Sequence, residues 1–121
     1  MNTETLSKKY CNSLTSYSRY ITRVVKIGNV PLGGDNPIRI QSMTTTNTMD
    51  TIATVEQSIR IIEAGADYVR ITAPSLNEAK NLENIKKELR SRGYDAPLIA
   101  DIHFTPNAAE LAAKLVKKVR V

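Results

Sequence analysis

The sequence contains a single cysteine, a single histidine and no tryptophan in 121 residues. One cysteine, Cys11, excludes an internal disulfide, and with one histidine it supplies too few ligands for a metal site. No apolar run approaches the roughly 18 residues that a membrane span needs. These scarcities exclude a disulfide-stapled protein, and we expect neither a membrane partner nor a metal ligand in this chain.

Aromatic residues make up only 5% of the sequence, although the formal net charge is +5. A basic chain suggests nucleic acid or a smaller anion as its partner. The densest basic cluster lies at residues 86–92, at the end of a predicted helix, where cations complement the helix dipole. Because no aromatic residue interleaves with these charges, we expect no nucleic-acid partner.

Residues 1–21 are polar and lack the apolar core of a secretory signal. We expect them to form a mobile leader in which Cys11 has no role, and we expect the protein to be cytoplasmic. Residues 22–121 are enough for one domain with a single modest core.

Two turn signals, Gly28-Asn29 and Gly33-Gly34-Asp35, divide the start of this domain. They predict a β-hairpin followed by a strand over residues 38–43. A glycine-rich loop cradles phosphate when a helix follows it. Here a strand follows, so the loop is predicted to be structural.

Helical and strand patterns alternate after Asp50. Gly65 and Gly93 are placed to end the first two of three predicted helices, and Ser75 with Glu78 has the spacing of a capping box at the start of the second. Strands are predicted over 66–72, 97–101 and 118–121.

Such alternation predicts an α/β fold with a parallel sheet of about four strands and three helices. No G-x-G-x-x-G follows a strand, which disfavours a dinucleotide-binding sheet. A (β/α)8 TIM barrel needs roughly 250 residues, and the chain stops inside its last predicted strand. We therefore expect residues 22–121 to be the truncated N-terminal half of such a barrel, preceded by the hairpin.

Each predicted strand has one apolar face and one face that turns polar toward its carboxyl end. Ile38 and Ile40 are expected to pack under the helices. The opposite faces carry the candidate site residues, which are Gln41, Arg70, Asp101 and Arg120, with His103 two residues after Asp101.

Ligands of parallel α/β folds bind at the carboxyl ends of the strands. Arginine binds phosphate through two parallel hydrogen bonds, so the pattern favours a phosphate or diphosphate site. Two structural alternatives stay open. In the first, Arg70 and Asp101 form an ion pair that only fixes the strand register. In the second, His103 caps a helix and does not contact a ligand.

Four segments occur together in a known order and spacing: "VKIGNVPLGGDNPIRIQSMTTTNTMD", "EAGADYVRIT", "PLIADIHF" and the terminal "KVRV". In these segments the chain resembles the 4-hydroxy-3-methylbut-2-enyl diphosphate synthase family of the non-mevalonate isoprenoid pathway. The resemblance covers roughly residues 22 to 121. Among members of the family, the chain looks most similar to the longer form of the enzyme.

The resemblance implies an iron-sulfur oxidoreductase that reductively opens and dehydrates 2-C-methyl-D-erythritol 2,4-cyclodiphosphate. It implies Asp101 and His103 as catalytic residues and Arg70, Arg120, Gln41 and Ser42 as substrate-binding residues. It also implies a [4Fe-4S] cluster held by three cysteines and a glutamate in a C-terminal domain, a ferredoxin or flavodoxin type reductant, and a homodimer.

This chain has none of those cluster ligands, so we expect it to bind no cluster and to be inactive alone. Two other interpretations remain open: a pterin-binding barrel of the dihydropteroate synthase kind, and a non-catalytic βα module that binds a partner through its sheet edge.

Overall fold

The structure is a computed structural model that describes residues 13–121. Cys11 and the first twelve residues of the expected leader lie outside the described residues. The elements in chain order are β1 (Val25–Ile27), β2 (Val30–Leu32), β3 (Gln41–Met43), α2 (Thr51–Glu63), β4 (Tyr68–Thr72), α3 (Leu76–Ser91), β5 (Leu98–Asp101), α4 (Pro106–Leu115) and β6 (Lys118–Arg120). No helix among residues 13–121 is long and apolar enough to span a membrane.

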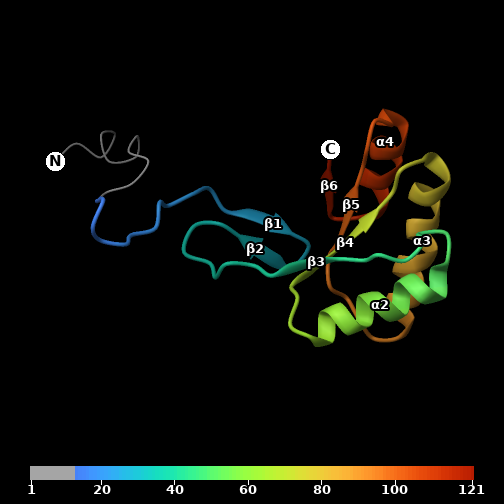
Figure 1. Ribbon diagram of the computed structural model, residues 1–121, viewed down its shortest axis with the longest axis horizontal. Helices are drawn as coiled ribbons and strands as arrows, with labels where there is room; N and C mark the ends of the chain where they lie inside the picture. The colour runs from blue at the N-terminus through green and yellow to red at the C-terminus, as the bar shows by residue number, and fades with distance from the viewer. Residues whose placement is uncertain (1–12) are drawn as a thin grey trace.

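Strands β3, β4, β5 and β6 form a parallel sheet in that order. Helices α2, α3 and α4 lie on one side of it (Figure 1). The core between these layers is mostly apolar, with Val69, Ile71, Leu98 and Ala100 on the strands and Leu82, Ile85 and Leu89 on α3. The predicted α/β class, with four parallel strands and three helices, is confirmed.

The β1–β2 hairpin lies on the other side of the sheet (Figure 1). Its Ile27 is buried against Tyr68 and Ile99, which are inward residues near the starts of β4 and β5. The Tyr68 hydroxyl donates to the Val30 carbonyl at 3.2 Å. The hairpin therefore covers the amino-terminal part of this face and leaves the carboxyl ends of the strands open.

The first strand of the sheet is shorter than predicted, and the expectation that Ile38 and Ile40 pack under helices is wrong. Ile38 is 80% exposed and Ile40 is 58% exposed. The backbone of Ile40 is held instead, because its N–H donates to the Asp67 carboxylate and its carbonyl accepts from the Asp67 and Tyr68 N–H groups. Alternation predicted which face these side chains share. Both residues precede β3, however, and a hollow lies between Ile40 and α2 in place of close packing.

The predicted capping box at the start of α3 does not form as expected. At the start of α2, Asp50 caps the helix, since its carboxylate accepts from the Ala53 N–H at 3.1 Å. Ser75 does not cap α3 through its side chain, because its hydroxyl bonds the Glu78 carboxylate instead. Thr105 precedes Pro106 at the start of α4 but also makes no side-chain cap.

Candidate functional site

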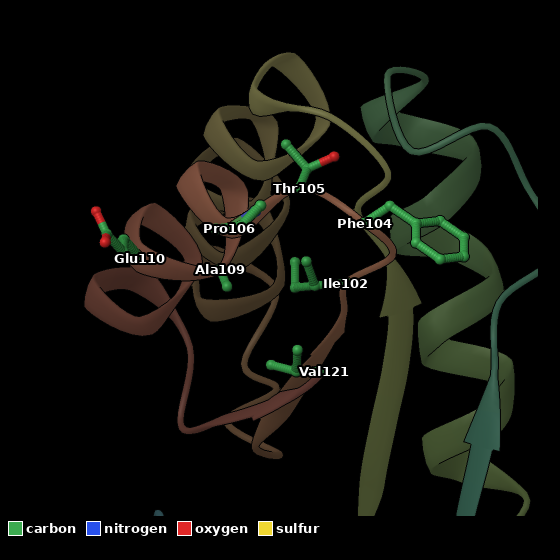
Figure 2. Close-up of a pocket in the computed structure, with 7 residues that line it drawn as sticks. All are labelled: Ile102, Phe104, Thr105, Pro106, Ala109, Glu110 and Val121. Carbon is green, nitrogen blue, oxygen red and sulfur yellow. The ribbon is translucent and has the colours of Figure 1, made fainter.

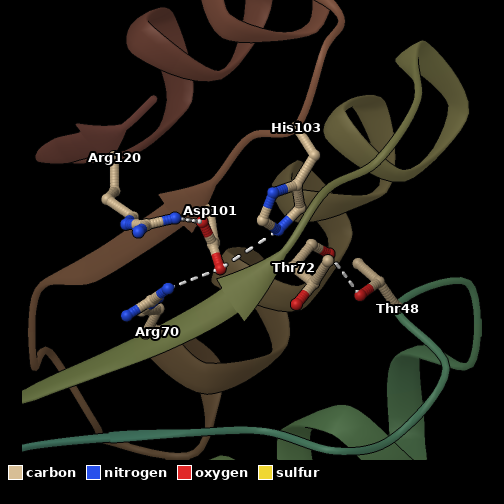
Figure 3. A network of polar contacts seen from close by, with 6 residues as sticks. All are labelled: Thr48, Arg70, Thr72, Asp101, His103 and Arg120. Carbon is tan, nitrogen blue, oxygen red and sulfur yellow. Dashed lines mark hydrogen bonds and ion pairs between the residues drawn. The ribbon is translucent and has the colours of Figure 1, made fainter.

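Asp101 lies at the centre of a charged cluster at the carboxyl end of the sheet (Figure 3). Its side chain is 1% exposed. Arg70 Nη2 donates to Asp101 Oδ2 at 2.7 Å, and Arg120 Nη1 donates to Asp101 Oδ1 at 3.1 Å. One buried carboxylate thus binds two guanidinium groups, one from each neighbouring strand.

The strand register explains why these side chains meet. Across the inward face, paired residues form two rows, the lower being Met43, Arg70, Ile99 and Lys118 and the upper being Thr72, Asp101 and Arg120. Arg70 lies one row below Asp101 and is long enough to reach it. Arg120 lies beside Asp101 in the same row.

The cations around Asp101 hold the pKa of its carboxyl below the usual value. Burial raises this pKa, but hydrogen bonds from Arg70 and Arg120 and the nearby charges of Arg70 and His103 outweigh the effect of burial. Asp101 is therefore ionised at neutral pH and neutralises only one of its two arginines. Arg70 Nε is also buried without a hydrogen-bond partner among the described residues.

His103 follows β5 and turns back toward the same carboxylate (Figure 3). Its Nε2 lies 3.4 Å from Asp101 Oδ2, and its side chain is 44% exposed. The ring therefore touches the cluster on one side and faces solvent on the other.

A polar network that the sequence did not predict holds the loop over residues 44–50 beside the cluster. The Thr48 hydroxyl donates to the Thr72 carbonyl at 2.6 Å, at the end of β4 (Figure 3). Asn81 of α3 is buried, and its amide donates to the Thr48 carbonyl at 2.7 Å. The Gln57 amide oxygen accepts from the Thr45 and Thr46 N–H groups. Several of the loop's polar groups are thus used to fix the loop itself.

Gln41 and Ser42 do not join the cluster. Gln41 pairs with Tyr68, so it shares the inward face but lies one row below Arg70. Ser42 pairs with Val69, whose side chain belongs to the helix-side core. Ser42 therefore faces α2, where it lines a shallow hollow with Gln57. Of the predicted site residues, the structure brings together Arg70, Asp101, His103 and Arg120.

Phe104 is the one non-glycine residue with positive φ in the described part of the chain, at 56°. Its side chain is also fully exposed, although it directly follows His103. The Thr105 hydroxyl lies 3.0 Å from the Pro74 carbonyl and 3.1 Å from the His103 carbonyl. This contact ties the loop after β5 to the loop after β4 and holds the left-handed turn in place.

Replacing Phe104 with glycine should stabilise the protein by about 1 kcal/mol, because glycine adopts positive φ without the steric cost that an L side chain bears. Chemical denaturation measures the change in the free energy of unfolding. Phe104→Ala is the matched control, since it removes the exposed ring but keeps the strain, and it should change stability by less than about 0.5 kcal/mol. Equal stabilisation by both variants would mean that the ring, and not the backbone, is responsible.

A hollow beside α4 is the other feature of this end of the sheet (Figure 2). Its lining is mostly apolar and consists of Ile102, Phe104, Thr105, Pro106, Ala109, Glu110 and Val121. Glu110 is its one titratable side chain, and Ile102 and Ala109 have no polar side-chain groups. The hollow therefore lacks the paired charges that the Asp101 cluster provides.

A parallel sheet whose strands follow in chain order, with its helices on one face (Figure 1), is the arrangement of a β/α barrel, and barrels bind their ligands at the carboxyl ends of the strands. The family model described as "GcpE TIM-barrel domain" matches residues 22–121. The chain therefore belongs to this family, as its sequence motifs had indicated.

Curated relatives carry the name 4-hydroxy-3-methylbut-2-en-1-yl diphosphate synthase (flavodoxin). The chain is 58% identical to the Phocaeicola vulgatus protein over 108 residues, which are 89% of this chain and 18% of that protein. It is 51% identical to the Akkermansia muciniphila protein over 116 residues, which are 96% of this chain and 20% of that protein. The chain thus spans about a fifth of the length of these relatives. The matches favour the synthase family over the pterin-binding and non-catalytic alternatives.

Proposed function

We propose that this chain provides the diphosphate-binding part of a 4-hydroxy-3-methylbut-2-enyl diphosphate synthase. The complete reaction reductively opens and dehydrates 2-C-methyl-D-erythritol 2,4-cyclodiphosphate. The names of the relatives support the reaction, and the charged cluster supports the kind of substrate. We further propose a cytoplasmic location and a homodimer for the full-length synthase, which is called the natural protein below.

The observation that carries the proposal is the charge balance around Asp101. One carboxylate accepts a single hydrogen bond from each of two guanidinium groups, so several of their other N–H donors are not used by Asp101. The side chains of Arg70 and Arg120 are 24% and 52% exposed. A diphosphate would supply the missing negative charge and accept these donors in pairs.

Each member of the cluster then has a distinct role. Arg70 and Arg120 bind the diphosphate oxygens, and Asp101 holds both guanidinium groups in position. His103 is the one member of the four whose side chain both donates and accepts hydrogen bonds, as general acid–base catalysis requires. We assign it proton transfer to the oxygen that leaves the carbon skeleton during dehydration.

The electrons for this reaction come from outside the described residues. The relatives' name points to a flavodoxin reductant, and the resemblance adds a [4Fe-4S] cluster that would pass electrons to the substrate. The residues of this chain do not fit such a cluster, because the sequence has one cysteine and residues 13–121 contain no group of three possible ligands.

Arg70→Lys tests the diphosphate site in the natural protein. The charge is kept but the two-pronged hydrogen bonding is lost, so the affinity for inorganic diphosphate should fall about tenfold, which corresponds to the loss of roughly one charge-assisted hydrogen bond. Isothermal titration calorimetry measures the affinity. The control is Arg92→Lys, since Arg92 pairs with Glu88 on the surface of α3 at 2.9 Å. Unchanged affinity in Arg70→Lys would rule out the proposed site.

A further inference from the structure

Lys118 faces the same side of the sheet as the Asp101 cluster. It precedes Val119 in β6, and Val119 packs against the helix-side core. Because strand side chains alternate, Lys118 and Arg120 both point to the opposite, inward side. The register agrees, since Lys118 pairs with the inward residue Ile99 and Arg120 pairs with Asp101.

Lys118 and Arg70 lie on either side of Ile99 in the lower row. Two strand spacings separate their backbones, which is about 10 Å. The Arg70 side chain extends from the lower row to Asp101 in the upper row. The side chain of Lys118, on the opposite side of Ile99, is long enough to extend over the same distance. The ammonium group of Lys118 is thus within reach of the space in front of Asp101, opposite Arg70.

The surroundings of Lys118 leave its charge without a counter-ion. Among residues 13–121, the carboxylate of this face, Asp101, is engaged by Arg70 and Arg120, and no described acidic residue forms an ion pair with Lys118. Lys118 is nevertheless half-buried, whereas its neighbour Lys117 is exposed. Holding a half-buried ammonium on a face that already has excess positive charge is unfavourable unless an anion binds there.

We propose that Lys118 is a third cationic residue of the anion site and contacts the phosphate group farther from Arg70. The inference rests on the proposed function and makes it more specific. A ligand with two linked phosphate groups fits cations on both flanks of Asp101, while a monophosphate engages one flank. Lys118 should therefore contribute to the preference for a diphosphate over a single phosphate.

This role is tested by measuring the affinity of the natural protein and its variants for inorganic diphosphate and for inorganic phosphate. Isothermal titration calorimetry at fixed ionic strength measures both affinities. Lys118→Met should weaken diphosphate binding about tenfold, as expected for one lost charge-assisted hydrogen bond, and should weaken phosphate binding less than threefold. Lys118→Arg should stay within about threefold of the natural protein for both anions. The matched control is Lys117→Met, which removes the same charge one residue away and should change neither affinity.

The outcomes separate this inference from the proposed function. If Arg70→Lys weakens diphosphate binding but Lys118→Met does not, the third cation is disproved and the site stands. If neither variant weakens it, both are disproved. Equal losses in Lys118→Met and Lys117→Met would show a general effect of net charge and would also overturn the inference. Circular dichroism checks that the variants are folded, and Lys118→Gln replaces Lys118→Met if the latter is not.

Discussion

Asp101→Asn is expected to lower the free energy of unfolding by about 3 kcal/mol, the low end of the range for removing one partner from a buried ion pair. The asparagine keeps the shape but leaves Arg70 and Arg120 side by side with no negative charge between them. Arg120 is half exposed, so most of the loss comes from Arg70. Urea denaturation of the natural protein and the variant at pH 7 measures the difference.

The pH dependence provides the control for this prediction. The pKa of Asp101 is lower in the folded state than its ordinary value of 3.8, so its stabilisation is complete above that value and is lost as the pH falls through the folded-state pKa. The difference in stability between the unsubstituted chain and Asp101→Asn should therefore persist above about pH 4 and shrink as the pH falls below it. A difference that persisted unchanged in acid would show that packing, and not charge, is responsible.

His103→Asn is expected to lower the turnover number about 100-fold, the low end of the range for general acid–base catalysis. The amide replaces one hydrogen bond of the imidazole but does not transfer a proton near neutral pH. Anaerobic turnover of the cyclodiphosphate by the full-length synthase carrying this substitution, with reduced flavodoxin, measures the effect. The affinity for inorganic diphosphate should stay within about threefold, because the arginines that bind it are unchanged.

A different pattern would change the interpretation of the site. If His103→Asn kept normal turnover but had a lower melting temperature, His103 would have a structural role in capping the start of α4. If Asp101→Asn and Arg70→Lys also bound diphosphate normally and only melted early, the cluster would be an ion-pair network that fixes strand register.

The elements of the fold followed from local patterns. Gly65 and Gly93 have positive φ directly after α2 and α3, as expected of residues that end helices. The inward positions of Arg70 and Asp101 followed from strand alternation, because both strands lie in the middle of the sheet and have defined faces. Predicting the contact between Arg70 and Asp101 required one further assumption, that consecutive strands pair in parallel.

The remaining features depend on contacts between distant segments. The resemblance implied both Gln41 and Ser42 as substrate-binding residues, yet adjacent strand residues face opposite sides. The exposure of Ile38 depends on whether a helix covers the edge strand, which its own pattern does not determine. Asn81 is 33 positions from the Thr48 carbonyl that it holds, so no local signal identified it.

The hairpin packed against Tyr68 and Ile99 also affects the electrostatics of the site above it. Its Ile27 and Leu32 place hydrocarbon, in place of water, beneath the row that carries Arg70. Water would screen the field of the arginines from below, whereas hydrocarbon polarises little and leaves that field stronger. The open carboxyl side, in contact with solvent, is then the direction from which an anion is attracted. The β1–β2 hairpin, which carries none of the residues of the cluster, thus helps to set how strongly and from which side the site attracts its ligand.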